Sequence, residues 1–94
     1  MFKTPDIKTI SLLGTDIPVV ISSWKCNRIE ADGVYEAECI FLREAYETEA
    51  EYKRILTHEA FHALYEIIGC QLDIHMEETL AHLISKHMTL NVLT

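Results

Sequence analysis

Apolar residues in the second half of the chain recur at helical spacing. Steps of three and four residues place them on one face of a helix, and they are Tyr52, Ile55, Leu56, Ala60, Ala63, Leu64 and Ile67. Thr48 and Glu51 form a T-x-x-E capping box before this stretch, and Gly69 suits a left-handed cap after it. The pattern therefore predicts a half-buried helix from about Glu49 to Ile68.

A second helical pattern follows the turn at residues 69–72. Asp73 can N-cap a helix that runs to about Val92, and its apolar stripe is formed by Leu80, Ala81, Ile84 and Met88. Glu77 projects within this stripe, whereas Glu78 projects on the polar side with His82, Ser85 and Thr89. A carboxylate on the core side costs several kcal/mol unless it is paired or binds a metal. Glu77 is therefore expected to have a partner.

The first half of the chain has the alternation of β-strands. Ile10 and Leu12 alternate with polar neighbours, the segment 14–16 turns, and residues 17–21 follow, which predicts a β-hairpin. Pro18 lacks a ladder donor, so its strand should lie at an edge or have the missing amide facing out. A turn at Asp32-Gly33 precedes one predicted strand from Val34 to Leu42. Trp24 is interpreted as a cover of the core.

Length and composition predict one globular domain over residues 1–94. About half of the residues are apolar, and the elements above predict an α+β fold with a small antiparallel or mixed sheet of about three strands packed on two helices. The net charge of −7 disfavours nucleic acid and anionic membranes as partners. No segment has the length of a membrane span and no signal peptide is apparent, so a cytoplasmic protein is expected.

The three cysteines agree with that compartment. Cys26, Cys39 and Cys70 have no C-x-x-C spacing and are odd in number, which indicates buried free thiols in a reducing environment. The oligomeric state is left open by the sequence.

The strongest chemical signal is the H-E-x-x-H pattern formed by residues 58–62 within the first helix. His58 and His62 lie one turn apart, so their imidazoles can bind one Zn²⁺ at about 2.0–2.1 Å. Glu59 lies beside them. It is interpreted as the general base that activates a zinc-bound water for attack on a peptide carbonyl.

A catalytic zinc commonly has three protein ligands and one open position. Glu66 lies two turns beyond His58, about 12 Å along the helix, and is a poor third ligand. The third ligand should therefore come from another element. Glu77 is preferred and Glu78 is the alternative, because helix registers predicted from sequence are uncertain by a residue or more. The Cys70 thiolate is a further alternative.

The H-E-x-x-H pattern followed by Glu77-Glu78-Thr79-Leu80-Ala81 resembles the zincin metallopeptidases of the gluzincin type. It is similar to small single-domain members, many of them encoded by phages and prophages. The metzincin extension would need Gly at position 65 and His at position 68, where this chain has Tyr65 and Ile68. The resemblance implies zinc-dependent hydrolysis of a peptide or protein substrate. It also implies His58, His62 and Glu77 as ligands and Glu59 as base.

Several alternatives remain open. In zincins the strand before the active helix commonly binds the substrate main chain, so part of the segment 35–40 binds peptide or is an ordinary half-buried strand. His75, His82 and His87 are interpreted as surface or packing residues. His82 is also a candidate to orient a ligand or stabilise an oxyanion, and Tyr46 and Tyr65 are candidates for an electrophilic hydrogen bond. An interaction protein on a zincin scaffold, such as a phage effector that binds a host partner without proteolysis, is the second function. The third interpretation is that no metal binds.

Overall fold

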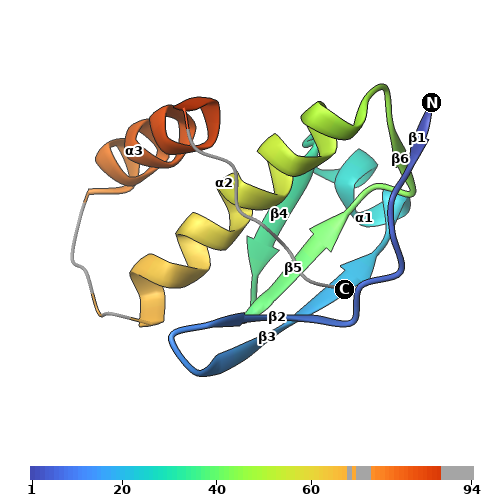
Figure 1. Ribbon diagram of the computed structural model, residues 1–94. Coiled ribbons are helices and arrows are strands. Elements are labelled where there is room, and N and C mark those ends of the chain that lie inside the picture. The colour runs from blue at the N-terminus through green and yellow to red at the C-terminus, as the bar shows by residue number, and fades with distance from the viewer. Residues whose placement is uncertain (68, 70–72, 88–94) are drawn as a thin grey trace.

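The computed structural model describes residues 1–67, 69 and 73–87 (Figure 1). The predictions that concern Cys70, Met88, Thr89 and Val92 lie outside the described residues. The elements in chain order are β1 (Phe2–Lys3), β2 (Thr9–Leu12), β3 (Thr15–Ile21), α1 (Ser23–Arg28), β4 (Gly33–Glu36), β5 (Cys39–Leu42), β6 (Ala45–Tyr46), α2 (Glu49–Ile67) and α3 (Ile74–His87). The predicted α+β class is confirmed.

The strands form a mixed four-stranded sheet in the order β2-β3-β5-β4 and a separate two-stranded pair, β1-β6. In the larger sheet β3 and β5 are parallel, and the other neighbouring strands are antiparallel. The mixed character agrees with the sequence prediction, with four strands in place of about three. β2 and β4 are the two edges of this sheet.

The predicted hairpin at residues 9–21 is confirmed. Leu13 and Gly14 form its two-residue turn with φ of 49° and 79°, the left-handed values that such turns require. Pro18 does not lie on an edge strand, because β3 pairs with both β2 and β5. Its pairing with β5 begins only at Val19, and Val19 donates its amide to Lys8 on the β2 side. The backbone amides of successive strand residues point to opposite sides, so the nitrogen of Pro18 points toward β5. The N–H that Pro18 lacks is therefore at a position where no ladder bond is needed.

The prediction of one strand from Val34 to Leu42 is wrong. The chain reverses at Ala37 and Glu38, with φ of 52° and 61°, and the two halves pair as the antiparallel hairpin β4-β5. A turn of this type commonly carries Gly or Asn, which accept positive φ at low cost. Neither residue is present to mark it. As a consequence β4 is a short edge strand beside α2.

The core lies between the sheet and α2, which crosses one face of the sheet in Figure 1. Its buried residues are Ile7, Ile10, Ile17, Val19, Ile40, Leu42, Tyr46, Tyr52, Ile55, Leu56, Ala60 and Ala63. Thr48 caps α2 as predicted, because its Oγ1 accepts from the Glu51 amide at 3.1 Å. Among the described residues no helix is both long and apolar enough to cross a membrane.

The interpretation of Trp24 as a core cover is wrong. Its side chain is 68% exposed on α1, a helix that the sequence pattern did not predict, and the Arg28 guanidinium lies over its ring at 5.3 Å. The buried residue of α1 is Cys26. Because α1 is only about one and a half turns long, it buries a single small side chain and leaves the Trp24 indole exposed.

Gly33 allows α2 to approach β4 closely. A Cβ at this position would lie 2.7 Å from Cγ2 of Ile55 and 3.4 Å from Cγ of Glu59. Both contacts lead to α2, which carries the H-E-x-x-H residues. The Asp32-Gly33 pair, interpreted from sequence as a turn signal, is therefore also a packing requirement that holds Glu59 against the sheet edge.

Replacing Gly33 by Ala is expected to lower the free energy of unfolding by about 1–3 kcal/mol, because an added methyl group must displace the buried Ile55. Urea denaturation measures the loss. Ser11→Ala, at an exposed position of β2, is the matched control and should change stability by less than about 0.5 kcal/mol. Equal stabilities of the Gly33→Ala variant and the native chain would contradict the close approach.

Candidate metal centre

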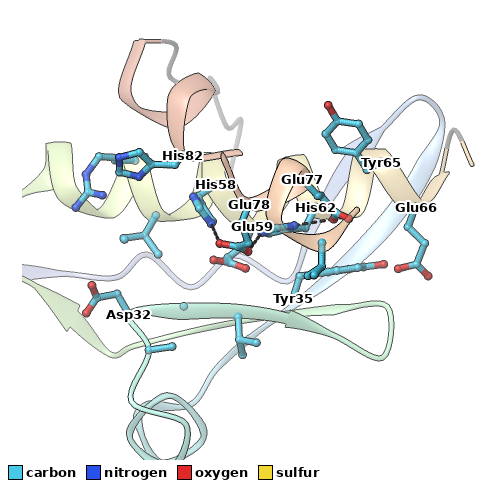
Figure 2. Close-up of a pocket in the computed structure, with 16 residues that line it drawn as sticks. Asp32, Tyr35, His58, Glu59, His62, Tyr65, Glu66, Glu77, Glu78 and His82 are labelled. Atoms are coloured by element: carbon cyan, nitrogen blue, oxygen red, sulfur yellow. Dashed lines mark hydrogen bonds and ion pairs between the residues drawn. The ribbon is translucent and has the colours of Figure 1, made fainter. Parts of the chain in front are cut away.

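A pocket of about 710 Å³ lies between β4, α2 and α3. Figure 2 shows its lining residues, with the polar side chains of the two helices meeting above β4. The motif residues His58, Glu59 and His62 line it from α2, and Glu77 and Glu78 line it from α3. The residues that the sequence singled out are thus brought together by α2, β4 and α3.

His58, His62 and Glu78 form a cluster whose ligand atoms all lie within 4.8 Å of one another. Nε2 of His58 is 3.5 Å from one carboxylate oxygen of Glu78, and Nε2 of His62 is 2.5 Å from the other. The two imidazoles, with ring centres 5.0 Å apart, thus present the same type of nitrogen to one carboxylate. This convergence follows from the one-turn spacing of the two histidines on α2.

Glu77 contacts the same histidine from the other side. Its Oε1 lies 2.7 Å from Nδ1 of His62, the nitrogen that does not face Glu78. The sequence preference for Glu77 over Glu78 as third ligand is therefore not what the geometry favours. Glu78 lies where a third ligand is needed, and Glu77 lies where a carboxylate can fix the orientation and tautomer of a ligand histidine.

The rotation of α3 explains this exchange. The helix begins as predicted, since Asp73 Oδ1 accepts from the His75 amide at 2.7 Å. It then turns Ala81 and Ser85 inward, with exposed fractions of 0% and 3%, and leaves Leu83 46% exposed. Ala81 belongs to the predicted stripe, but the sequence placed Ser85 on the polar side with Glu78, so the buried face is rotated toward Glu78. Glu78 shares their face at a spacing of three and seven residues.

Glu59 is buried beside the cluster, on the side toward β4 (Figure 2). The pKa of its carboxyl is raised to about 7, chiefly by burial and also by the charge of Glu78. The charge of His62 and a hydrogen bond from the Tyr35 backbone amide act in the opposite direction. A carboxyl with this pKa can accept and return a proton near neutral pH.

The donor set fits a divalent cation. Two imidazole nitrogens and one carboxylate are ligands that zinc commonly takes, and ligand atoms around a tetrahedral Zn²⁺ lie about 3.3 Å apart. The separation of 3.5 Å between His58 and Glu78 agrees with this value, and the 2.5 Å separation at His62 would have to open by about 0.8 Å.

The contacts of His62 are also compatible with a bound cation. A carboxylate faces each of its ring nitrogens, but a neutral imidazole has only one N–H to donate. A cation between Nε2 and Glu78 would satisfy that side, while Nδ1–H donates to Glu77. Burial also lowers the pKa of His58 in spite of the nearby Glu78 carboxylate, which favours the neutral imidazole that a metal requires.

Comparisons of this chain with protein-family models, with curated proteins and with solved structures found no match. A function can therefore be inferred only from the residues of the site itself.

The remaining candidates separate by their position. His82 and Tyr65 line the pocket and stay candidates for contact with a reacting carbonyl. Tyr46 does not, because its hydroxyl donates to the Asp32 carbonyl at 2.5 Å and accepts from the Arg43 amide in the core. His75 is exposed at the start of α3, and the side chain of His87 lies outside the described part.

Two of the three predicted thiols fall within the described residues. Cys26 is fully buried and Cys39 is half-buried, and both are free. Burial raises the pKa of each thiol, so neither is prepared to act as a thiolate. Neither residue lines the candidate metal pocket.

The raised pKa of Glu59 predicts a pH dependence of stability in the metal-free protein. A folded-state pKa of about 7, above the ordinary 4.5, means that the folded chain binds the proton more tightly than the unfolded chain. Stability should therefore fall as pH rises from about 4.5 to about 7, by about 3 kcal/mol in total.

Urea denaturation in the presence of a chelator, compared between the native chain and Glu59→Gln, isolates this contribution. The variant cannot ionise at position 59, so its stability advantage should grow over that pH range and then level off. A difference that stays constant with pH would contradict the raised pKa.

Proposed function

We propose that this protein is a zinc-dependent peptidase whose metal is held by His58, His62 and Glu78. The observation that carries the proposal is the convergence of these three side chains beside a buried carboxyl, Glu59, in an open pocket that borders a sheet edge. The family resemblance of the H-E-x-x-H pattern supports the same reaction. The free thiols further support an intracellular, reducing site of action.

A Zn²⁺ bound at this site would supply a Lewis acid that polarises the scissile carbonyl and lowers the pKa of water toward 7. Glu59 then takes one proton from the attacking water on its carboxylate. The water oxygen bonds to the carbonyl carbon, the C–N bond breaks, and Glu59 returns the proton to the leaving amine nitrogen. The carboxyl is thus regenerated as a carboxylate at the end of the cycle.

The other pocket residues hold the reacting groups in place. Glu77 orients His62 through Nδ1, and the Tyr35 amide orients Glu59 from β4. Gly33 keeps the edge strand close to Glu59. These contacts fix the base and the ligands before a substrate arrives, which is the arrangement that catalysis by positioned groups requires.

The proposal is tested with a diverse peptide mixture analysed by mass spectrometry. The zinc-loaded protein should cut at defined bonds, lose this activity on chelation and regain it with one equivalent of Zn²⁺. Absence of cleavage by protein that holds zinc would contradict the peptidase. It would favour instead a role in binding a partner protein through the same metal-containing scaffold.

A further inference from the structure

The side of the pocket that α2 forms has opposite charges at its two ends. Residues 54, 58, 62 and 66 lie four apart on one face of the helix and all line the pocket. Arg54 is at one end, the two candidate ligands are in the middle, and Glu66 is at the other end. The first and last are twelve residues apart, about 18 Å along the helix.

The end at Arg54 favours an anion. Arg54 is exposed and, among the described residues, makes no ion pair. His82 lines the same end of the pocket from α3 (Figure 2). Asp32 is the acidic residue at this end, and its carboxylate lies 3.8 Å from the Arg43 guanidinium. The uncompensated charge at this end is therefore that of the Arg54 guanidinium.

The end at Glu66 favours a cation. The Tyr35 hydroxyl is hydrogen-bonded to the exposed Glu66 carboxylate, a contact that contributes with burial to raising the Tyr35 pKa to about 12. These two residues also line a second pocket of about 500 Å³, to which Asp16 and Glu38 contribute. None of the described residues that line this second pocket is Lys or Arg. A positively charged group of a ligand would therefore not be repelled by a described basic side chain of this pocket.

The direction of β4 relates this charge pattern to the direction of a peptide. Gly33 lies against Ile55 and Glu59, and Tyr35 reaches Glu66, so β4 runs in the same sense as α2. A peptide paired antiparallel with β4, the more stable ladder, would run from the Glu66 end to the Arg54 end. Its amino-terminal side would meet the acidic end and its carboxyl-terminal side the basic end.

We propose that this pocket selects peptides by charge order, with a basic residue or free amine on the amino-terminal side at Glu66 and a carboxylate on the carboxyl-terminal side at Arg54. This substrate class rests on the proposed function. At about 3.3 Å per residue, the 18 Å between the two charges corresponds to a segment of five or six residues. Both groups act in positioning the substrate and neither takes part in the chemistry.

The test measures binding, so that it does not depend on hydrolysis. Two blocked hexapeptides of identical composition are used, acetyl-Lys-Ala-Ala-Ala-Ala-Glu-amide and acetyl-Glu-Ala-Ala-Ala-Ala-Lys-amide. Their affinities for zinc-loaded Glu59→Gln protein are measured by calorimetric titration. The peptide with Lys first should bind at least about tenfold more tightly, and this ratio should shrink between about 0.01 M and about 1 M salt.

Charge reversal in the same Glu59→Gln background decides which residues are responsible. Adding Arg54→Glu together with Glu66→Lys leaves the net charge unchanged and should invert the preference, so that the peptide with Glu first binds more tightly. Arg28→Glu on α1, outside the pocket, is the control and should preserve the original preference. Equal affinities for the two peptides, or a preference that the double reversal does not change, would overturn the proposal. Failure of hydrolysis with the preference intact would count against the peptidase alone.

Discussion

Replacing Glu59 by Gln is expected to lower peptide hydrolysis by about a thousandfold and to leave the zinc content unchanged. Glutamine has nearly the same shape and can still accept a hydrogen bond from the Tyr35 amide. It cannot take a proton from water at neutral pH. The substitution thus removes the base from the proposed site while the three ligands keep their positions.

The measurement compares initial rates of cleavage of one identified peptide with zinc content determined on the same samples. Glu47→Gln is the matched control, because Glu47 is exposed just before α2 and lies outside the pocket. That control should retain the rate of the native chain. A Glu59→Gln protein that binds zinc and cleaves at more than about a tenth of the native rate would rule out Glu59 as the base.

Substitution of Glu78 is expected to weaken zinc binding more than substitution of Glu77. Glu78→Gln removes the anionic ligand that faces both Nε2 atoms. Glu77→Gln keeps an acceptor for the Nδ1–H of His62 and changes only its charge. For Glu77→Gln a loss of about tenfold in zinc affinity is expected, at the lower end of what partners of ligand residues contribute, and for Glu78→Gln the loss should exceed about 100-fold.

Competition with a chromogenic chelator measures both affinities under one set of conditions. The two variants have the same change in charge at adjacent positions of α3, so each serves as the control for the other. The reverse order, with Glu77→Gln losing zinc and Glu78→Gln keeping it, would restore the ligand set predicted from the sequence.

Much of the fold could be predicted because several elements carry strong local signals. The apolar period of α2, the Thr48 cap and the hairpin at residues 9–21 each combine a pattern with a capping or turn residue. The placement of His58 and His62 on one helix face follows from backbone geometry alone. A carboxylate from the next helix beside these two histidines could be predicted as well, since a third ligand on α2 itself would lie too far away.

Which of the two carboxylates faces both Nε2 atoms could not be predicted, because the buried face of α3 includes a polar residue that the apolar stripe leaves out. Ala81 of the stripe is buried together with Ser85, which the sequence placed on the polar side with Glu78, so the buried face is rotated toward Glu78. One residue of rotation is enough to exchange the roles of Glu77 and Glu78. Small residues at the spacing of a helix contact are the sequence signal that could have indicated this rotation of α3.

The turn at Ala37 and Glu38 was missed for a different reason. Both residues have positive φ, a conformation that their side chains disfavour, so no local preference marks the reversal. The pairing of β4 with β5 and the packing of β4 against α2 must stabilise it. The consequence for the site is considerable, since the reversal makes β4 the edge strand that borders the pocket.

The measurement that tests the metal centre most directly is the zinc content of purified protein after reconstitution and removal of loosely bound metal. Elemental analysis should find about one Zn²⁺ per native chain at pH near 7 and less than about 0.1 per chain in His62→Ala. A native chain with less than about 0.1 zinc, or a His62→Ala chain that keeps a full equivalent, would contradict the site formed by His58, His62 and Glu78.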